Sequence, residues 1–184
     1  DLGGVERGAV EIARAITAAG GRALVASEGG RLAARLVACG AEPVTAPMAS
    51  KNPLVMAANV RRLAKLIREE QVEIVHARSR APAWSAWLAA RQTGCAFVTT
   101  WHGAHRARGP LKKLYNSVMG FGRPVIAISD FIAEMATGVY GVPPEQIVTI
   151  PRGADINAFA EEVVSAERTI TIARDWGIVE DPRP

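Results

Sequence analysis

The sequence of 184 residues lacks several features that assign a protein quickly to a class. It has only two cysteines, Cys39 and Cys95, too few for a disulfide scaffold and without metal-ligand spacing, which indicates buried thiols in a reducing compartment. No apolar run approaches the ~18–20 residues that a membrane span needs. With 49% apolar and 22% charged residues, a disordered or fibrous chain is excluded, and the length suits one globular domain.

Acidic residues are missing from residues 74–129, although that segment holds eight lysines and arginines. The segment therefore carries +8, and because the whole chain carries +4, the remainder carries −4. This asymmetry favours an anionic partner: phosphates, nucleic acid or an acidic membrane surface. Alternatively, the cations lie on scattered solvated faces. Nucleic acid is disfavoured because the segment shows neither a recognition helix nor an aromatic platform on a sheet.

Apolar residues recur with helical and strand spacing in turn along the chain. Helices are expected at residues 6–19, 30–39, 53–70, 82–92, 111–121 and 130–139, and strands at 22–27, 42–46, 72–77, 96–101, 124–129 and 146–151. This alternation predicts an α/β fold with a Rossmann-like, doubly wound parallel sheet and helices on both faces. In such sheets, ligands bind beyond the carboxyl ends of the strands.

Two segments suggest the limits of this domain. Gly3 and Gly4 precede a helix as the turn after a strand would, so we expect a first strand upstream of residue 1. We expect the domain to cover residues 1–160 and residues 161–184 to form a helix and a linker. Gly3 and Gly4 also form a candidate phosphate site, because glycine lets a ligand approach the free N–H groups of a helix N-terminus. Alternatively, they serve the turn alone.

A nicotinamide-dependent oxidoreductase is a rival interpretation of the same turn. Glu28 follows the next predicted strand, where an acid that binds ribose would lie. The dinucleotide fingerprint Gly-x-Gly-x-x-Gly is absent, however, since the glycines fall at positions 3, 4 and 8.

Arg78, Ser79 and Arg80 follow the strand predicted at residues 72–77. Two arginines around a serine can hold an anionic or polyhydroxyl group by forked hydrogen bonds. Alternatively, they form a solvated loop whose arginines pair with acids elsewhere. His76 lies inside the apolar strand and is interpreted as a core histidine with a hydrogen-bond partner.

His102 and Gly103 follow the strand predicted at residues 96–101. A histidine at that edge can donate a hydrogen bond to a substrate hydroxyl or exchange a proton near neutral pH. Gly103 lets the backbone turn beside a ligand. His105 lies two residues further on, but without a third ligand nearby we expect no metal site.

Residues 106–123 combine basic and apolar side chains. The candidate anion-binding residues are Arg106, Arg108, Lys112 and Lys113. On a helix, Leu111, Leu114, Tyr115 and Val118 share one face, and Lys112, Lys113 and Asn116 lie away from it. Such a helix can lie in the headgroup region of an anionic membrane. Alternatively, its apolar face packs on the sheet.

Four motifs in order resemble the N-terminal domain of a family 4 glycosyltransferase, of the retaining, two-Rossmann-domain GT-B type. They are residues 3–6 (Gly-Gly-Val-Glu), 100–103 (Thr-Trp-His-Gly), 127–130 (Ala-Ile-Ser-Asp) and 150–155 (Ile-Pro-Arg-Gly-Ala-Asp) with Phe159. The last motif departs from the family, which usually has asparagine where this chain has Arg152.

The resemblance implies a glycosyltransferase that takes a sugar from a nucleotide-sugar donor, with no cofactor or metal. In that family the glycine turn faces the donor diphosphate, so Gly3 and Gly4 would bind it. His102 would hold the transferred sugar, and Arg78, Ser79, Arg80 and Gly103 would line the acceptor side. Most donor affinity resides in a C-terminal domain, so residues 1–184 alone are expected to be inactive.

The resemblance also implies an acceptor and a location. Relatives that build lipopolysaccharide or glycolipid in bacteria work at the inner face of the cell membrane, and some dock there through a basic, aromatic helix. We therefore expect a cytoplasmic protein, peripheral at that membrane, with a glycolipid or saccharide of the cell envelope as acceptor. A non-enzymatic sugar-binding or membrane-docking module is the other alternative.

Overall fold

The computed structural model describes residues 4–30, 33–105, 109–153 and 163–178. The chain divides into two units, residues 1–151 and 152–184. The boundary expected near residue 160 lies outside the described residues.

The first unit begins with two helices and two parallel strands. They are α1 (Gly4–Ala18), β1 (Leu24–Ser27), α2 (Ala33–Ala38) and β2 (Glu42–Thr45). The strands pair in register from Leu24 with Glu42 to Ser27 with Thr45. Small and branched apolar residues from α1, α2 and the strand ends form a core of their own: Val10, Ala13, Ala23, Leu36 and Ala41.

A pair of long helices leads into the second sheet. The chain continues through α3 (Pro53–Glu69), β3 (Ile74–Ala77), α4 (Arg80–Thr93) and β4 (Ala96–Trp101). The start of α3 follows the sequence closely, because the Asn52 side chain accepts a hydrogen bond from the Leu54 N–H and Pro53 occupies the first turn. Alanines on α4, including Ala83 and Ala89 with no exposed surface, let this helix pack closely.

The rest of the first unit completes a four-stranded parallel sheet. Its elements are α5 (Pro110–Ser117), a 3-10 turn η1 (Val118–Gly120), β5 (Val125–Ala127), α6 (Asp130–Tyr140), a 3-10 turn η2 (Pro144–Gln146) and β6 (Ile147–Thr149). The strand order is β3-β4-β5-β6. Trp101, Val118, Met119 and Val125 are fully buried in its core.

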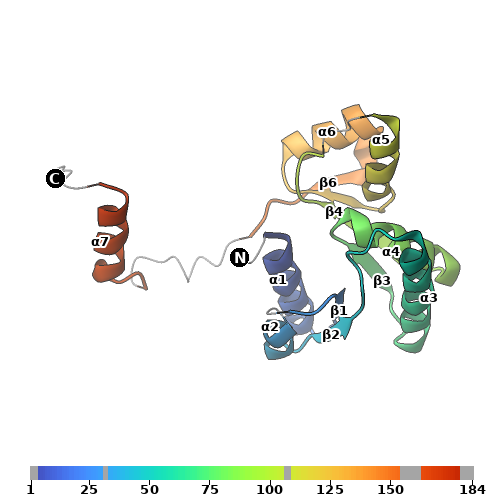
Figure 1. The fold of residues 1–184 in the computed structure, drawn as a ribbon, viewed down its shortest axis with the longest axis horizontal. Coiled ribbons are helices and arrows are strands. Elements are labelled where there is room, and N and C mark those ends of the chain that lie inside the picture. Colours follow the sequence, from blue (N-terminus) through green and yellow to red (C-terminus); the bar gives the residue numbers. More distant parts are fainter. Residues whose placement is uncertain (1–3, 31–32, 106–108, 154–162, 179–184) are drawn as a thin grey trace. The chain divides into compact units, whose positions relative to one another are not determined.

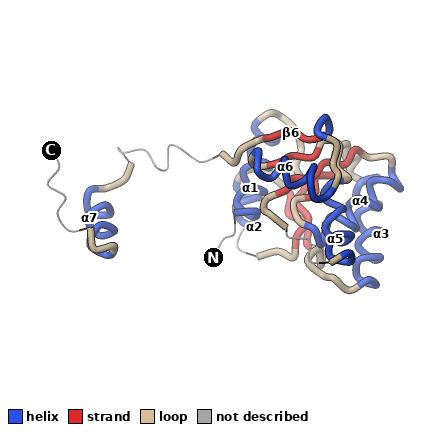
Figure 2. Tube along the Cα trace, turned by 90° about the horizontal axis from the view of Figure 1, so that it is seen from above, coloured by secondary structure: helices blue, strands red, loops and turns tan. Residues whose placement is uncertain are grey.

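The arrangement confirms the predicted fold class, because all six strands run parallel between helices (Figures 1 and 2). Figure 2 shows α1 and α2 on one side of the strands and α3 and α4 on the other. The strands form two hydrogen-bonded sheets, β1-β2 and β3-β4-β5-β6. Among the described residues β1, β2, β3 and β6 each have one unpaired edge. The strand expected upstream of residue 1 remains a prediction.

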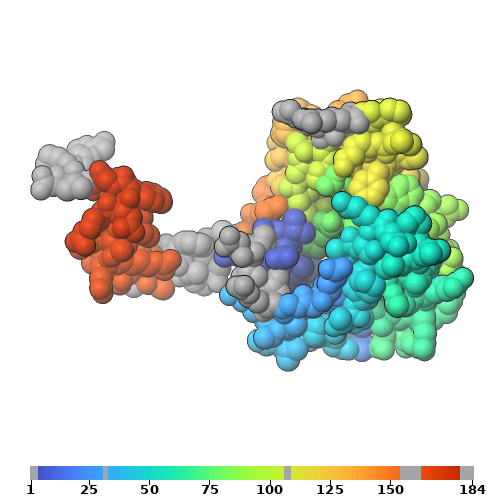
Figure 3. All heavy atoms as spheres, viewed as in Figure 1, coloured from blue at the N-terminus to red at the C-terminus, as the bar shows by residue number. Residues whose placement is uncertain are grey.

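The orientation of α5 differs from the alternative in which its whole apolar face packs on the sheet. Leu111 and Leu114 are 82% and 60% exposed, whereas Asn116, which we expected away from the packed face, is completely buried. Val118 is buried as expected. Figure 3 shows α5, in yellow, at the surface of the molecule. The buried side of α5 is therefore rotated toward Asn116, because this amide finds hydrogen-bond partners in distant elements.

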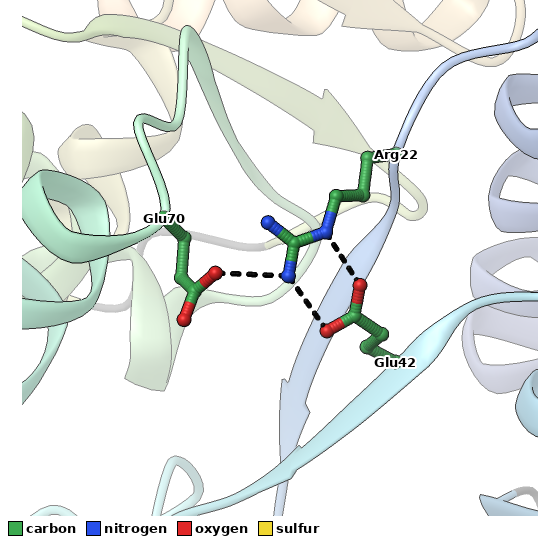
Figure 4. Close-up of polar contacts among 3 residues, drawn as sticks. All are labelled: Arg22, Glu42 and Glu70. Atoms are coloured by element: carbon green, nitrogen blue, oxygen red, sulfur yellow. Dashed lines mark hydrogen bonds and ion pairs between the residues drawn. The ribbon is translucent and has the colours of Figure 1, made fainter.

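A charged cluster links the small sheet to α3 (Figure 4). Arg22, just before β1, binds Glu42 at the start of β2 through Nε at 2.6 Å and Glu70 at the end of α3 through Nη2 at 2.8 Å. Arg22 lowers the pKa of the Glu42 carboxyl by hydrogen bonding and by its charge. All three side chains are partly exposed, so this cluster contributes little stability and mainly orients the elements.

The second unit contains one described helix, α7 (Ala166–Asp175), which lies within the helix expected after residue 161. The Ser165 hydroxyl caps it by accepting a hydrogen bond from the Arg168 N–H. Its apolar side chains are exposed, with Ile170 at 57% and Trp176 just beyond it at 75%. No helix among the described residues is long and apolar enough to cross a membrane.

Candidate functional site

The candidate site lies at the carboxyl ends of β3 and β4. These strands pair in register from Ile74 with Ala96 to Ala77 with Thr99, so both end at the same edge of the sheet. Arg78 follows β3, and His102 follows β4. The fold therefore brings together two segments that are 24 positions apart in the sequence, as expected for a parallel sheet.

Arg78 connects this edge to the first helix. Its Nη2 atom occupies the space beside Gly8, where an added Cβ would lie only 2.5 Å from it. Gly8 stands in the second turn of α1, which begins at Gly4. The guanidinium therefore lies against the N-terminal half of α1, whose end carries free N–H groups and a partial positive charge. Gly3 lies outside the described residues.

Ser79 and Arg80 have different surroundings from Arg78. Ser79 is exposed at the N-cap of α4, where its side chain makes no capping hydrogen bond. Arg80 turns toward α5: its Nη1 donates to Asn116 Oδ1 at 3.0 Å, and its guanidinium lies 6.0 Å from the Tyr115 ring centre. The two arginines thus reach different helices, Arg78 contacting α1 and Arg80 contacting α5.

His102 is half-buried directly after Trp101, which has no exposed surface. Gly103 follows it, and a Cβ added there would meet no atom within 4 Å. The loop at residues 102–105 therefore starts from a rigid strand end and passes open space at Gly103. This placement suits a side chain that must be held while a ligand approaches.

Burial determines the protonation of the other two histidines, His76 and His105. His76 Nε2 lies 2.7 Å from Thr100 Oγ1, which confirms the interpretation of a core histidine with a partner. Burial, helped by the charge of Arg78, lowers the pKa of His76 to about 4. Burial and the charges of Arg80 and Lys112 likewise lower the pKa of His105 to about 4. Both imidazoles are therefore neutral at pH 7.

The basic segment presents part of its charge on α5. Lys112 and Lys113 are exposed beside the exposed Leu111 and Leu114. Lys112 Nζ lies 5.7 Å from the centre of the Tyr115 ring. Arg106 and Arg108 lie outside the described residues. The exposed first turn of α5 therefore carries both leucines and lysines.

Three residues near the site escaped the sequence analysis: Gly8, Asn116 and Tyr140. Gly8 carries a weak signal, because it falls one helical turn after Gly4 on the same helix. Asn116 and Tyr140 bond to each other across 24 positions, a relation that no local pattern reveals. Among the described residues, no three His, Cys, Asp or Glu side chains gather as metal ligands.

Solved structures share this fold. The chain is similar to a glycosyltransferase from Rickettsia africae ESF-5, with 34% identity and a TM-score of 0.81 over 97% of this chain and 47% of that one. It is also similar to Anabaena Alr3699/HepE in complex with UDP-glucose, with 17% identity and a TM-score of 0.73, again over 97% and 47%. The second likeness shows the fold alone. The chain spans about half the length of both proteins.

Sequence comparison agrees with the fold. No curated protein matches this sequence. The model of Glycosyltransferase Family 4 matches residues 2–158, which covers most of the chain and all four motifs of the resemblance apart from the end of the last, Phe159. The chain belongs to glycosyltransferase family 4, as an N-terminal domain of the GT-B type.

Proposed function

We propose that the protein to which this chain belongs transfers a sugar from a nucleotide-sugar donor to an acceptor hydroxyl, with retention of configuration. The observation that carries the proposal is the packing of Arg78 against the N-terminal half of α1 at the same sheet edge as His102. A helix N-terminus and a guanidinium are two groups that bind phosphate. A glycosyl transfer must stabilise the charge that develops on the departing diphosphate.

Each candidate residue has a role in this proposal. The N–H groups at Gly3 and Gly4 bind the donor diphosphate. The resemblance places Arg78 on the acceptor side, but we assign its guanidinium to the diphosphate instead, because it lies against α1. His102 holds the transferred sugar by hydrogen bonding. Ser79, Arg80 and Gly103 line the side from which the acceptor enters. Holding the acceptor hydroxyl next to the anomeric carbon removes much of the entropic cost of the reaction.

We propose a uridine diphosphate sugar as the donor. The support is that Anabaena Alr3699/HepE, which shares the fold, was solved with UDP-glucose, with UDP and glucose, and with UDP. The specific sugar that this protein transfers, a hexose in our proposal, is selected together with the part of the protein beyond this chain.

Calorimetry on the full-length protein separates this proposal from the nicotinamide alternative. We expect UDP-glucose to bind and NADH to show no saturable heat at the same concentrations. NADH binding without UDP-glucose binding would favour the oxidoreductase based on Glu28. Binding of UDP-glucose without any release of UDP in the presence of a cell-envelope extract would favour the sugar-binding module.

We further propose that the acceptor is a cell-envelope glycolipid or saccharide and that α5 brings the protein to the anionic inner face of the cell membrane. The support is the exposure of Leu111 and Leu114 beside Lys112 and Lys113. Leucines can enter the headgroup region while lysines approach anionic lipid.

Vesicle sedimentation tests this surface. Full-length protein should pellet with vesicles that contain phosphatidylglycerol, and the double substitution Lys112→Glu with Lys113→Glu should abolish pelleting at 0.1 M salt. The matched control, Lys51→Glu with Arg61→Glu, changes as much charge at exposed sites outside α5 and should pellet normally. Pelleting that ignores both salt and the α5 charges would contradict the proposal.

A further inference from the structure

Three side chains from three helices form a continuous series of hydrogen bonds that ends at the backbone of the loop that carries His102. At the start of α4, Arg80 Nη1 donates to Oδ1 of Asn116 on α5 at 3.0 Å. Nδ2 of Asn116 donates to the hydroxyl of Tyr140, the last residue of α6, at 2.9 Å. The Tyr140 hydroxyl in turn donates to the backbone carbonyl of His105.

The donor and acceptor roles of these groups fix the direction in which the hydrogen bonds run. A guanidinium can only donate, so Asn116 must present its oxygen to Arg80. The single hydroxyl proton of Tyr140 goes to the His105 carbonyl, so its oxygen accepts from Asn116. Asn116 has no exposed surface, and an amide buried there needs both partners. Because the chain begins at a fixed positive charge, each bond strengthens the next.

Tyr140 contacts the chain on both sides of His102, at Trp101 and at His105. Its ring centre lies 4.8 Å from that of Trp101, which is fully buried and precedes the loop. Its hydroxyl donates to the carbonyl of His105, three residues after His102. The ring centres of Trp101 and His105 are 6.1 Å apart. One side chain therefore restrains the four residues that place His102 at the sheet edge.

We propose that Arg80, Asn116 and Tyr140 form a directional positioning chain that holds the 102–105 loop, so that His102 keeps its orientation during sugar transfer. The proposal rests on the function proposed for His102. Within this series of hydrogen bonds, Arg80 acts on the loop through Asn116 and Tyr140. Arg80 also faces the acceptor side in the proposed function.

Two single substitutions interrupt this series of hydrogen bonds and change the shape of the side chain little. Tyr140→Phe removes the donor to His105 but keeps the ring against Trp101. Asn116→Asp keeps the acceptor for Arg80 but replaces the N–H donor to Tyr140 with a carboxylate oxygen, so that the single Tyr140 proton can serve the carboxylate or the His105 carbonyl but not both. Tyr115→Phe is the matched control, since it also removes a tyrosine hydroxyl from this region, and that hydroxyl is not part of the chain.

Hydrogen exchange in the full-length protein tests the restraint without any need for activity. Amides of residues 103–105 should exchange about tenfold faster in Tyr140→Phe and in Asn116→Asp, as the loss of one hydrogen bond predicts. In the double variant the effect should not double, because one break already releases the loop. Unchanged exchange in both folded single variants would overturn the proposal, even if sugar transfer is established.

Kinetics test the effect on His102. For release of UDP from UDP-glucose, we expect kcat to fall about tenfold in both variants while KM changes less than twofold, because binding persists but orientation is lost. Tyr115→Phe should match the unsubstituted protein. Faster exchange with an unchanged kcat would overturn the positioning role. If the unsubstituted protein releases no UDP while the exchange prediction holds, the proposed function fails and the restraint on the loop stands.

Discussion

The guanidinium of Arg78 occupies the space that a side chain at position 8 would need. This packing therefore requires a glycine on the side of α1 that faces Arg78. Glycine in a helix lowers helix stability by about 1 kcal/mol relative to alanine. The consequence is a cation held near the N-terminal turns of a helix, where an anion also gains from the helix dipole.

At Gly8, substitution separates packing from ligand binding. Gly8→Ala should displace the flexible end of Arg78 and lower the affinity of the full-length protein for UDP several-fold, with a melting temperature close to that of the unsubstituted protein. Gly138→Ala, on α6, meets no atom within 4 Å and serves as control. Equal UDP affinity in all three proteins would separate Arg78 from the donor site.

His76 gives a prediction about pH. Its pKa is about 4 in the folded state and about 6.5 in an unfolded chain. The unfolded chain therefore takes up a proton first as the pH falls, so stability present above pH 6.5 is lost between pH 6.5 and 4. Urea unfolding at pH 7.5, 5.5 and 4.5 should show this loss, and His76→Gln should reduce it. A loss of the same size in the variant would assign it to other groups, such as His105.

Among the elements, α5 shows the limit of sequence reasoning. Helices and strands were predicted well because the spacing of apolar residues is a local property. The buried side of α5 could not be predicted in this way. Asn116 lies on that side and forms hydrogen bonds to Arg80 and Tyr140, which are 36 and 24 positions away in the sequence. Likewise, His76 could be interpreted from its strand alone, whereas the contact between Arg78 and Gly8 required the fold.

Two truncations test the orientation of α5 by their effect on the free energy of unfolding. Val118→Ala, at a fully buried site in η1, should lower it by about 2 kcal/mol through lost burial and a small cavity. Leu111→Ala, at a site 82% exposed, should change it by less than about 0.5 kcal/mol. A loss at Leu111 as large as that at Val118 in urea titrations would place Leu111 against the core, as in the alternative in which the whole apolar face packs on the sheet.

For the whole molecule, the parallel strands place Arg78 and His102 at one edge of the sheet, which we propose as the place of sugar transfer. The strand expected upstream of Gly3 and Gly4 stays a prediction, because four strand edges are unpaired among the described residues and none of them identifies its place. The binding, vesicle and kinetic measurements on the full-length protein test the donor, the membrane surface and the reaction that we propose.

The most direct test of the account is the rate at which full-length protein with His102→Ala releases UDP from UDP-glucose. If His102 holds the transferred sugar at the edge of the sheet, its loss should cost on the order of 10²-fold in kcat, as for one preorganised hydrogen-bond donor. A decrease of less than about threefold, in a protein that still folds and binds UDP, would contradict the placement of the reaction at this edge.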